Sequence, residues 1–468
     1  MRIQKNKILF YILIFGFLIR LIFILFGADQ YFNRENIYVD GDTKAWSTAF
    51  ENLVEHGEYT VNPDSEYGYF GRMPGYSMFM GSIWLVTGKN WELSFMICGW
   101  LQTILDTISI YFIFLIGNAL INKKTGLTTA FLYALYPFII VWNPVAYSES
   151  PAIFFLLASL ALLTNKRTAI TYLLSGILIG MAALNRPQIL IFVPFAGLFI
   201  LMAHSDRFFK SIKPILFFSL GFLLMLGPWT ARNIINHEKP IITQDLRGFP
   251  NWNTDVISFM QYIYSVKAEW SPQFEQILQN KTVELPDRAY TSRKDSILLK
   301  RTLELCKTCG SGFSHWNGYW KEPIKKENCN DEISKNFDYL RTQQIETNPF
   351  SYYIKIPLQN LKKAIFKSSL QYDAKSGSKL ASILFLYRSF LILLALAGSF
   401  ILIREKRETA FIPLSWMFLY IALCFGTGVQ FRNIEMRYFL PADILMLIPA
   451  AHVIHIILNR LKRTPAHE

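Results

Sequence analysis

The chain has 468 residues, of which 52% are hydrophobic, 16% aromatic and 17% charged, and its formal net charge is +13. Soluble domains carry roughly a quarter charged residues, so this composition and the positive mean hydropathy exclude a soluble enzyme. Long apolar runs instead predict a polytopic helical membrane protein, because a helix needs about 20 apolar residues to cross a bilayer. The basic residues cluster beside these runs. Membrane topology therefore explains most of the charge, and we expect no nucleic-acid partner.

The first apolar run follows a basic N-terminal segment, as a secretory signal would. It is long for a signal and no small-residue cleavage site follows, so we expect an uncleaved first span. Nine further runs have a similar character. The ten predicted spans are residues 8–27, 94–117, 126–143, 148–164, 168–184, 188–204, 214–230, 380–403, 409–427 and 439–459.

Residues 73–88 form a shorter apolar segment of 16 residues with an early proline and glycine. If this segment crossed the membrane, the basic residues of five later loops would lie outside, against the usual cytoplasmic bias. We therefore expect it to lie along the outer interface, with both termini in the cytoplasm. The five basic loops carry Lys123/Lys124, Lys166/Arg167, Arg207/Lys210/Lys213, Arg404/Lys406/Arg407 and Arg460/Lys462/Arg463.

Two long loops then face outward, residues 28–93 and residues 231–379. The second is too long for a simple connector and contains a helical-looking segment at 331–366. The expected organisation is an all-α membrane core at 1–230 that includes the first outer loop, a small extracytoplasmic domain at 231–379, and C-terminal membrane helices at 380–468.

Five arginines depart from the cytoplasmic bias of the basic residues, since each lies at the outer end of a span or interfacial segment. Snorkelling or contact with lipid head groups explains any single one. Together they favour a bound phospho-lipid, because a guanidinium group pairs well with two phosphate oxygens. These arginines are Arg72, Arg186, Arg232, Arg432 and Arg437.

Carboxylates lie on the same side. Asp40 and Asp42 follow the first span in YVDGDTKAW, and Glu149 opens the fourth in NPVAYSES. A structural role is expected for part of this group: a turn followed by a helix N-cap at Asp42, and a helix-dipole contact for Glu149. Carboxylates facing arginines at a water–lipid boundary also make a plausible reactive cleft, with phosphate as the leaving group and a carboxylate as the base.

The sequence resembles the GT-C glycosyltransferases of the protein mannosyltransferase and aminoarabinose transferase type. The resemblance covers roughly the first 243 residues and later touches only two short stretches, so residues 250–345 are unassigned by it. The matching segments are DTKAW and NLVEHGEYT (within 42–60), YFGRMPGYSMF (69–79), LYPFIIVWNPVAYSES (135–150), LNRPQ (184–188), GPWTARNIINHEKPIIT (227–243), TNPFSYYIK (347–355) and MRYFLP (436–441).

The resemblance implies a GT-C fold of about ten transmembrane helices with interfacial helices in the first outer loop. It also implies transfer, with inversion, of a sugar from a polyprenyl phosphate at the outer leaflet to a lipid, glycan or protein acceptor. Asp42 matches the base of this family, although Trp46 stands where the family usually has tyrosine, and Asp40 is the second candidate. The residues expected to bind substrate are Arg72, which would contact the donor phosphate, Tyr76, Glu149, Arg186, Arg232, Arg437 and Tyr438.

No cofactor is certain, but some members of the family hold a divalent ion, which here would lie at Asp42 and Glu149. Of the five cysteines, Cys98 and Cys424 fall in spans. In an oxidising compartment a disulfide is expected from Cys329 to Cys306 or Cys309. Zinc bound by these three thiolates and His315 is the alternative.

Two other functions share part of this pattern. A flippase for lipid-linked sugars would need polar residues through the membrane midplane, where Arg20 and Asp106 are the main exceptions to an apolar interior. A polymerase or ligase of the O-antigen type would share the outer arginines but not the first-loop aspartate. The glycosyltransferase interpretation, in a plasma membrane with the site facing outward, accounts for both sets of charges.

Overall fold

The computed structural model describes residues 7–204, 208–318, 329–366, 379–405, 407–432 and 435–461, and every regular element within these ranges is helical. Arg207, Lys406, Lys462 and Arg463, which are predicted to lie in cytoplasmic loops, are outside the described residues. The all-α fold class expected from the apolar runs is therefore what the described chain adopts.

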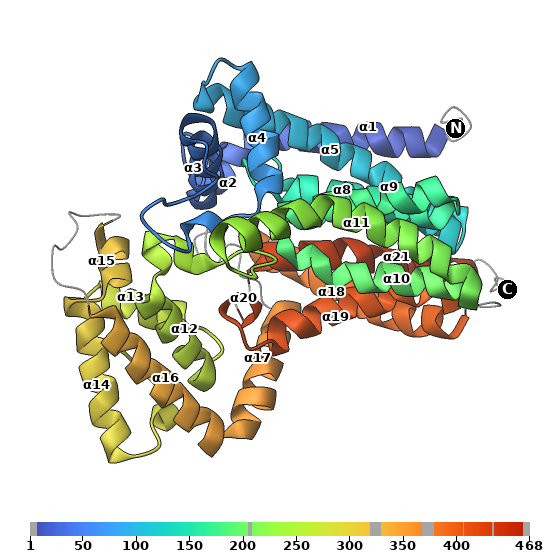
Figure 1. The fold of residues 1–468 in the computed structure, drawn as a ribbon. Coiled ribbons are helices and arrows are strands. Elements are labelled where there is room, and N and C mark those ends of the chain that lie inside the picture. The colour runs from blue at the N-terminus through green and yellow to red at the C-terminus, as the bar shows by residue number, and fades with distance from the viewer. Residues whose placement is uncertain are drawn as a thin grey trace.

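A bundle of roughly parallel and antiparallel helices forms the body of the molecule (Figure 1). Among the described residues, five helical segments are long and apolar enough to cross a membrane: α1 with its continuation to α2 (Lys7–Phe32), α5 (Trp91–Leu120), α11 (Phe208–His237), α18 (Lys379–Glu405) and α21 (Met436–Leu461). Shorter apolar helices lie beside them: α8 (Glu149–Asn165), α9 (Ala169–Asn185), α10 (Phe192–Ala203) and α19 (Phe411–Phe425). Helix α1 begins and α21 ends at the same end of the bundle, which agrees with an even number of crossings.

The continuous span predicted at 126–143 is wrong. The structure has α6 (Lys123–Ala134), then α7 (Pro137–Ile140), and from Val141 to Ser148 a buried loop. Proline disfavours helical backbone at the preceding residue, and Tyr136 is extended, at φ −76° and ψ 104°. The helix therefore stops before Pro137, and the loop that follows enters the region where the outer carboxylates lie.

The first outer loop folds into α3 (Gly41–His56) and α4 (Pro74–Val86), which cover one end of the bundle (Figure 1). At about 1.5 Å per residue, the 13 residues of α4 span roughly 20 Å, too little to cross a bilayer. Figure 1 shows α4 running across the direction of the long helices. The two helices meet at Gly81, where a Cβ would lie 2.1 Å from the Phe50 ring. The predicted interfacial position of residues 73–88 agrees with this geometry.

A separate group of helices lies at the same end of the molecule. It consists of α12 (Thr254–Val266), α13 (Ser271–Leu278), α14 (Arg293–Thr308), α15 (Ser311–Gly318) and α16 (Asn330–Thr347), and α17 (Ile356–Phe366) leads back to the bundle (Figure 1). These helices have their own apolar core, which includes Phe259, Phe274, Phe313 and Phe337. The unit is thus held together by packing independent of the membrane helices.

One disulfide, between Cys309 and Cys329, joins the end of α14 to the start of α16. The expected bond from Cys329 is confirmed, with Cys309 as its partner, while Cys306 is buried and free. Because the two sulfurs are bonded to each other, they are not available as the thiolate ligands of the alternative zinc site.

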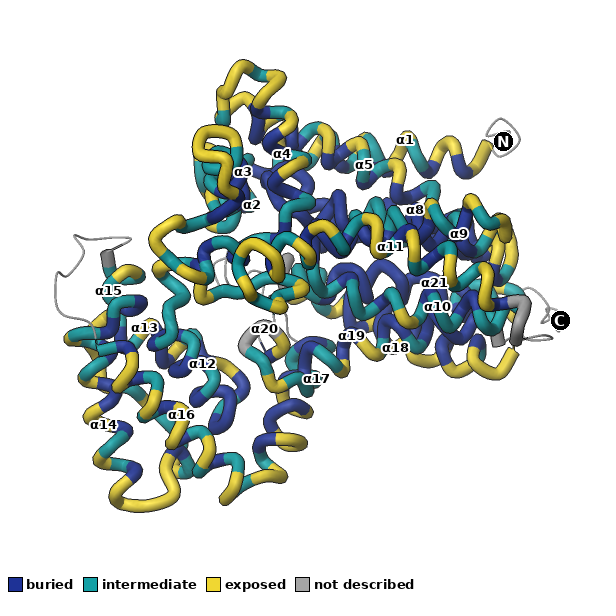
Figure 2. Tube along the Cα trace, in the orientation of Figure 1, coloured by how far each residue is buried: buried dark blue, intermediate teal, exposed yellow. Residues whose placement is uncertain are grey.

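Among the described residues, Arg20 with Asp106 and Arg388 with Asp443 form ion pairs inside the bundle, where an unpaired charge would be costly. Arg20 of α1 contacts Asp106 of α5 at 2.6 Å, so the two exceptions in the apolar interior are partners. Arg388 of α18 contacts Asp443 of α21 at 2.9 Å, a pair that the sequence analysis did not identify. Helix α21 is the most buried of the long helices, as its largely dark tube in Figure 2 shows. Each pair joins two neighbouring helices and fixes how each helix is turned about its own axis.

Candidate active site

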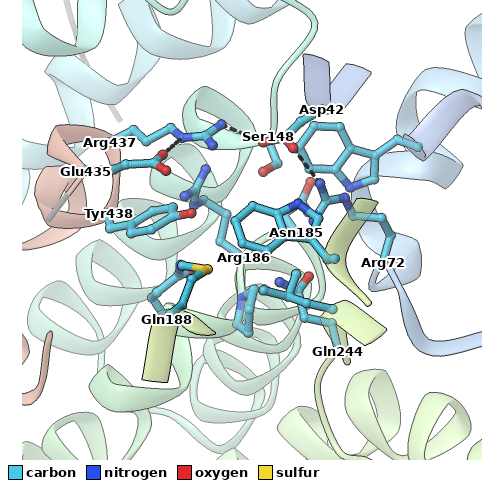
Figure 3. A pocket seen from close by; sticks show the side chains of 15 residues that line it. Asp42, Arg72, Ser148, Asn185, Arg186, Gln188, Gln244, Glu435, Arg437 and Tyr438 are labelled. Carbon is cyan, nitrogen blue, oxygen red and sulfur yellow. Dashed lines mark hydrogen bonds and ion pairs between the residues drawn. The ribbon is translucent and has the colours of Figure 1, made fainter. Parts of the chain in front are cut away.

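A pocket of about 100 Å³ lies where the first outer loop, the α9–α10 turn, the start of α21 and residues 244–260 meet (Figure 3). Each part comes from a different region of the chain, so the site exists only in the folded protein. It is lined by Asp42, Trp46, Arg72, Ser148, Asn185, Arg186, Pro187, Gln188, Gln244, Leu246, Trp252, Met260, Glu435, Arg437 and Tyr438.

The start of α3 determines which of the two aspartates faces this pocket. Asp40 is the N-cap: its carboxylate accepts a hydrogen bond from Gly41 N, and Thr43 completes a capping box. Asp40 also forms an ion pair with Arg34 at 3.2 Å and is not among the pocket residues. The predicted N-cap at Asp42 is therefore wrong, because the helix begins two residues earlier, and Asp42 in the first turn is left to point into the pocket.

The Asp42 carboxylate lies between two arginines. Its Oδ1 accepts a hydrogen bond from Arg72 Nη2 at 2.6 Å, and its Oδ2 accepts one from Arg437 Nη1 at 2.7 Å. Burial alone would raise the pKa of Asp42, but the positive charges of Arg437 and Arg72 outweigh it and hold that pKa well below its usual range. In this state Asp42 is a fixed anion.

Arg437 connects Asp42 to two further carboxylates. Its Nε lies 2.6 Å from Glu435, and its Nη1 lies 4.0 Å from Glu149 Oε1. Glu149 is buried and forms an ion pair with Arg186. Asp42, Glu435, Arg72, Arg186 and Arg437 line the pocket (Figure 3), while Glu149 lies behind the lining as the buried partner of Arg186.

Aromatic rings keep these arginines in place. The Arg72 guanidinium lies 4.9 Å from the Trp46 ring centroid and 4.8 Å from that of Phe249. Tyr438 lies 5.5 Å from the guanidinium of Arg186 and from that of Arg437. Such contacts orient a guanidinium without using its hydrogen-bond donors, which stay available to an anionic ligand.

The buried loop before α8, residues Val141–Ser148, holds the start of α3 by hydrogen bonds. Asp42 N donates a hydrogen bond to Tyr147 Oη at 3.4 Å, and Thr43 Oγ1 donates to Ala146 O at 3.2 Å. Tyr76 belongs to this support and not to the lining. It is fully buried, its hydroxyl donates to Gln102 Oε1 at 2.6 Å, and its ring packs against Trp46. The expected substrate contact of Tyr76 is therefore not supported by its position.

Arg232 also lies outside the pocket. Its guanidinium donates to Tyr69 O at 2.8 Å and to Tyr59 O at 2.7 Å, and so fastens the first outer loop to the end of α11. It lines a different cavity, beside Trp229 and His237. Arg432 likewise donates to backbone carbonyls, those of Gly426, Tyr264 and Tyr352. Two of the five outer arginines thus hold the fold together.

The described residues around Asp42 and Glu149 do not form a suitable set of ligands for a divalent ion. Within the described ranges there is no group of three or more histidine, cysteine or acidic side chains that could hold a metal. The Arg437 guanidinium contacts Asp42 and approaches Glu149, so a cationic group already lies at both carboxylates. We therefore assign no step to a metal.

Several lining residues were not singled out from the sequence. Glu435 stands next to the quoted MRYFLP segment, and Asn185 and Gln188 lie within LNRPQ, so a motif was the available signal for all three. Gln244 directly follows the quoted segment 227–243, whereas Trp252 lies in a stretch that no quoted segment covers. For Trp252 no motif was available, and only the fold brings it to the site.

Comparisons with known proteins agree with the expected family. The family model for dolichyl-phosphate-mannose-protein mannosyltransferases matches residues 76–231. No sequence among the curated proteins matches.

Two solved structures of an archaeal oligosaccharyltransferase share the fold at low identity. The Archaeoglobus fulgidus oligosaccharyltransferase in complex with zinc and sulfate superposes with a TM-score of 0.53 at 12% identity, covering 96% of this chain and 49% of that one. The A. fulgidus oligosaccharyltransferase AglB with an inhibitory peptide and a dolichol-phosphate gives 0.53 at 12% identity, over 100% and 53%. ArnT from Cupriavidus metallidurans bound to undecaprenyl phosphate gives 0.39 at 9%, over 94% and 77%.

The chain spans about half the length of the two oligosaccharyltransferase chains, so the likeness concerns their fold and not their whole activity. Residues 76–231 therefore match the family model for dolichyl-phosphate-mannose-protein mannosyltransferases, and the chain shares its fold with the A. fulgidus oligosaccharyltransferase.

Proposed function

We propose that the protein is an inverting glycosyltransferase that moves a sugar from a polyprenyl-phosphate donor to an acceptor hydroxyl or phosphate on the outer face of the plasma membrane. The observation that carries the proposal is the Asp42 carboxylate held between Arg72 and Arg437 in a pocket at the end of the membrane bundle. A base and a phosphate-binding pair are thereby in contact. The fold neighbour AglB was solved with a dolichol-phosphate, a ligand of this chemical class.

The arginines supply the contacts that a donor phosphate needs. Arg72, Arg186 and Arg437 converge on the pocket, and Arg72 Nε is buried without a hydrogen-bond acceptor among the described residues. An ionised phosphate presents only acceptor oxygens and matches such donors. A polyprenyl phosphate leaves as an anion, so these charges stabilise the leaving group as the bond to the sugar breaks.

The same arginines control when Asp42 can act. While both of its oxygens are held, the lowered pKa makes the carboxylate a weak base. A donor phosphate competes for Arg72 and Arg437. Its binding would withdraw positive charge from Asp42 and bring the pKa back toward its usual range.

Sugar transfer then needs only the donor, the acceptor and Asp42. The acceptor oxygen bonds to the anomeric carbon from the face opposite the phosphate, and the bond from that carbon to the phosphate oxygen breaks. When the acceptor is a hydroxyl group, its proton goes to Asp42. The electron pair of the broken bond stays on the polyprenyl phosphate. Inversion follows because there is a single displacement.

Binding of polyprenyl phosphate to the purified full chain tests the phosphate site. Arg72→Ala and Arg437→Ala should each weaken binding by about 10-fold or more, since a charge-assisted contact is lost. Arg301→Ala is the matched control, because Arg301 pairs with Glu332 on the exposed surface of α14 and α16. Equal affinities for all four proteins, including the parent, would show that the arginines bind something else.

A further inference from the structure

One wall of the pocket is built from neutral amides. Asn185, Gln188 and Gln244 line the cavity together with Trp252 and Met260. In the view of Figure 3, Gln188 and Gln244 lie on the opposite side of the pocket from Asp42 and Arg437. We refer to Asn185, Gln188 and Gln244 as the amide wall.

Asn185 has an acceptor atom without a donor. It is the last residue of α9 and only 7% exposed. Its Nδ2 donates to Met181 O at 2.8 Å, and this pairing with a carbonyl assigns the nitrogen to the helix side of the amide. The remaining Oδ1 is buried and accepts no hydrogen bond from any residue that the structure describes.

Gln188, three residues later, has a second acceptor oxygen without a donor among the described residues. Its Oε1 is also buried without a donor from the described chain. Pro187 begins a short helical turn at this point and has no backbone N–H to offer either oxygen. A buried acceptor left unpaired is costly, so the pocket is suited to a ligand that brings hydrogen-bond donors to this wall.

The donor's chemistry decides which of its parts fits here. An ionised phosphate has only acceptor oxygens, and a polyprenyl chain has no polar hydrogens, so neither can pair with Oδ1 of Asn185 or Oε1 of Gln188. Sugar hydroxyl groups can donate to both. The sugar is bonded directly to the phosphate, so a phosphate on Arg72 and Arg437 keeps the sugar within the same small cavity.

We infer that the amide wall is the sugar subsite: Asn185 and Gln188 accept hydrogen bonds from hydroxyl groups of the donor's sugar, beside the ring of Trp252. This inference rests on the proposed function and adds the residues that distinguish a sugar-bearing donor from bare polyprenyl phosphate. Sugar recognition and phosphate recognition are thereby assigned to different residues, which allows them to be tested separately.

The test compares affinities of the purified full chain for polyprenyl phosphate and for polyprenyl phosphates carrying mannose, glucose or N-acetylglucosamine. The quantity of interest is the Kd of the bare lipid divided by that of the tightest sugar-bearing lipid. Gln188→Met and Asn185→Leu should each lower this ratio by about 3- to 10-fold while leaving the Kd of the bare lipid unchanged. Gln343→Met, on α16 away from the pocket, should behave as the parent.

An unchanged ratio in both variants would overturn the sugar subsite and leave the phosphate site standing. Equal weakening of both classes of ligand would also overturn it, since the two residues would then act on the pocket as a whole. If the parent fails to bind bare polyprenyl phosphate, the proposed function itself is wrong. Using two variants of different size keeps the test valid if one of them does not fold.

Discussion

The two oxygens of Asp42 are held by different arginines, so Asp42 and a donor phosphate compete for the same positive charges. Asp42→Asn keeps the side-chain size but removes the competing charge and the ability to take a proton. We expect this variant to bind polyprenyl phosphate at least as tightly as the parent, by up to about 10-fold, while sugar transfer is lost. Titration calorimetry on folded protein measures the first effect. Weaker binding would mean that Asp42 holds the arginines in their phosphate-binding positions.

The lowered pKa of Asp42 predicts how stability depends on pH. An acid whose pKa is lower in the folded than in the unfolded state adds stability above the unfolded value, about 3.9, and loses it as the pH falls toward the folded value. The difference in Tm between the parent and Asp42→Asn should therefore be constant from pH 8 to 5 and fall below about pH 4. Thermal unfolding followed by tryptophan fluorescence checks this. A change between pH 8 and 6 would show that Asp42 titrates near neutrality without a donor.

Local motifs in the sequence predicted which residues lie near the site. Motifs at span ends placed Asp42, Arg72, Arg186, Arg437 and Tyr438 in the right region, and the structure puts all of them in the pocket lining. Motifs do not specify where a side chain points. Asp40 caps the start of α3, so its side chain faces away from the pocket. Tyr76 is buried and donates its hydroxyl to Gln102, so it does not reach the pocket either. The roles proposed for the pocket residues remain predictions.

At the scale of helices, apolar runs predicted most elements but not their ends. The run at 126–143 is largely apolar and carries no charge, yet Pro137 ends the helix. Residues Val141–Ser148 form a buried loop whose hydrogen bonds hold the start of α3. Hydropathy could not distinguish this loop from a span because both are buried in apolar surroundings. The ion pair between α18 and α21 was missed for a related reason, since each charge is isolated within its own apolar run.

That pair gives a prediction at the same scale. Asp443 accepts hydrogen bonds from Arg388 Nε at 2.9 Å and from Tyr136 Oη at 2.7 Å inside the bundle. Arg388→Met leaves a buried carboxylate without its counter-ion and should cost about 3–5 kcal/mol, whereas Arg388→Met with Asp443→Asn should cost clearly less than the two single changes added together. Unfolding in detergent measures the three variants. Additive costs would mean that the two charges are not coupled.

For the whole molecule, the arrangement of helices predicts which loops share a side of the membrane. The start of α5 lies at the same end as α3 and α4 (Figure 1). The 30 residues of α5 run along the bundle away from that end, and α6 begins at Lys123, just after α5 ends at Leu120. A cysteine at exposed Glu92 should react with an impermeant maleimide added to intact cells. A cysteine at exposed Lys124 should react only after permeabilisation. The native cysteines are buried or in the disulfide, so background labelling should be low. The reverse pattern would put the pocket on the cytoplasmic side.

The central claim is that this pocket transfers a sugar with Asp42 as the base. Mass spectrometry of cell-envelope glycans and glycoproteins tests it most directly, in cells that make the parent, Asp42→Asn, Asp40→Asn or no protein, with membrane levels matched. The account predicts a sugar-bearing product in cells with the parent and with Asp40→Asn, because asparagine is also a good N-cap. That product should be absent with Asp42→Asn and without the protein. The same product at the parent level in Asp42→Asn cells would contradict the account.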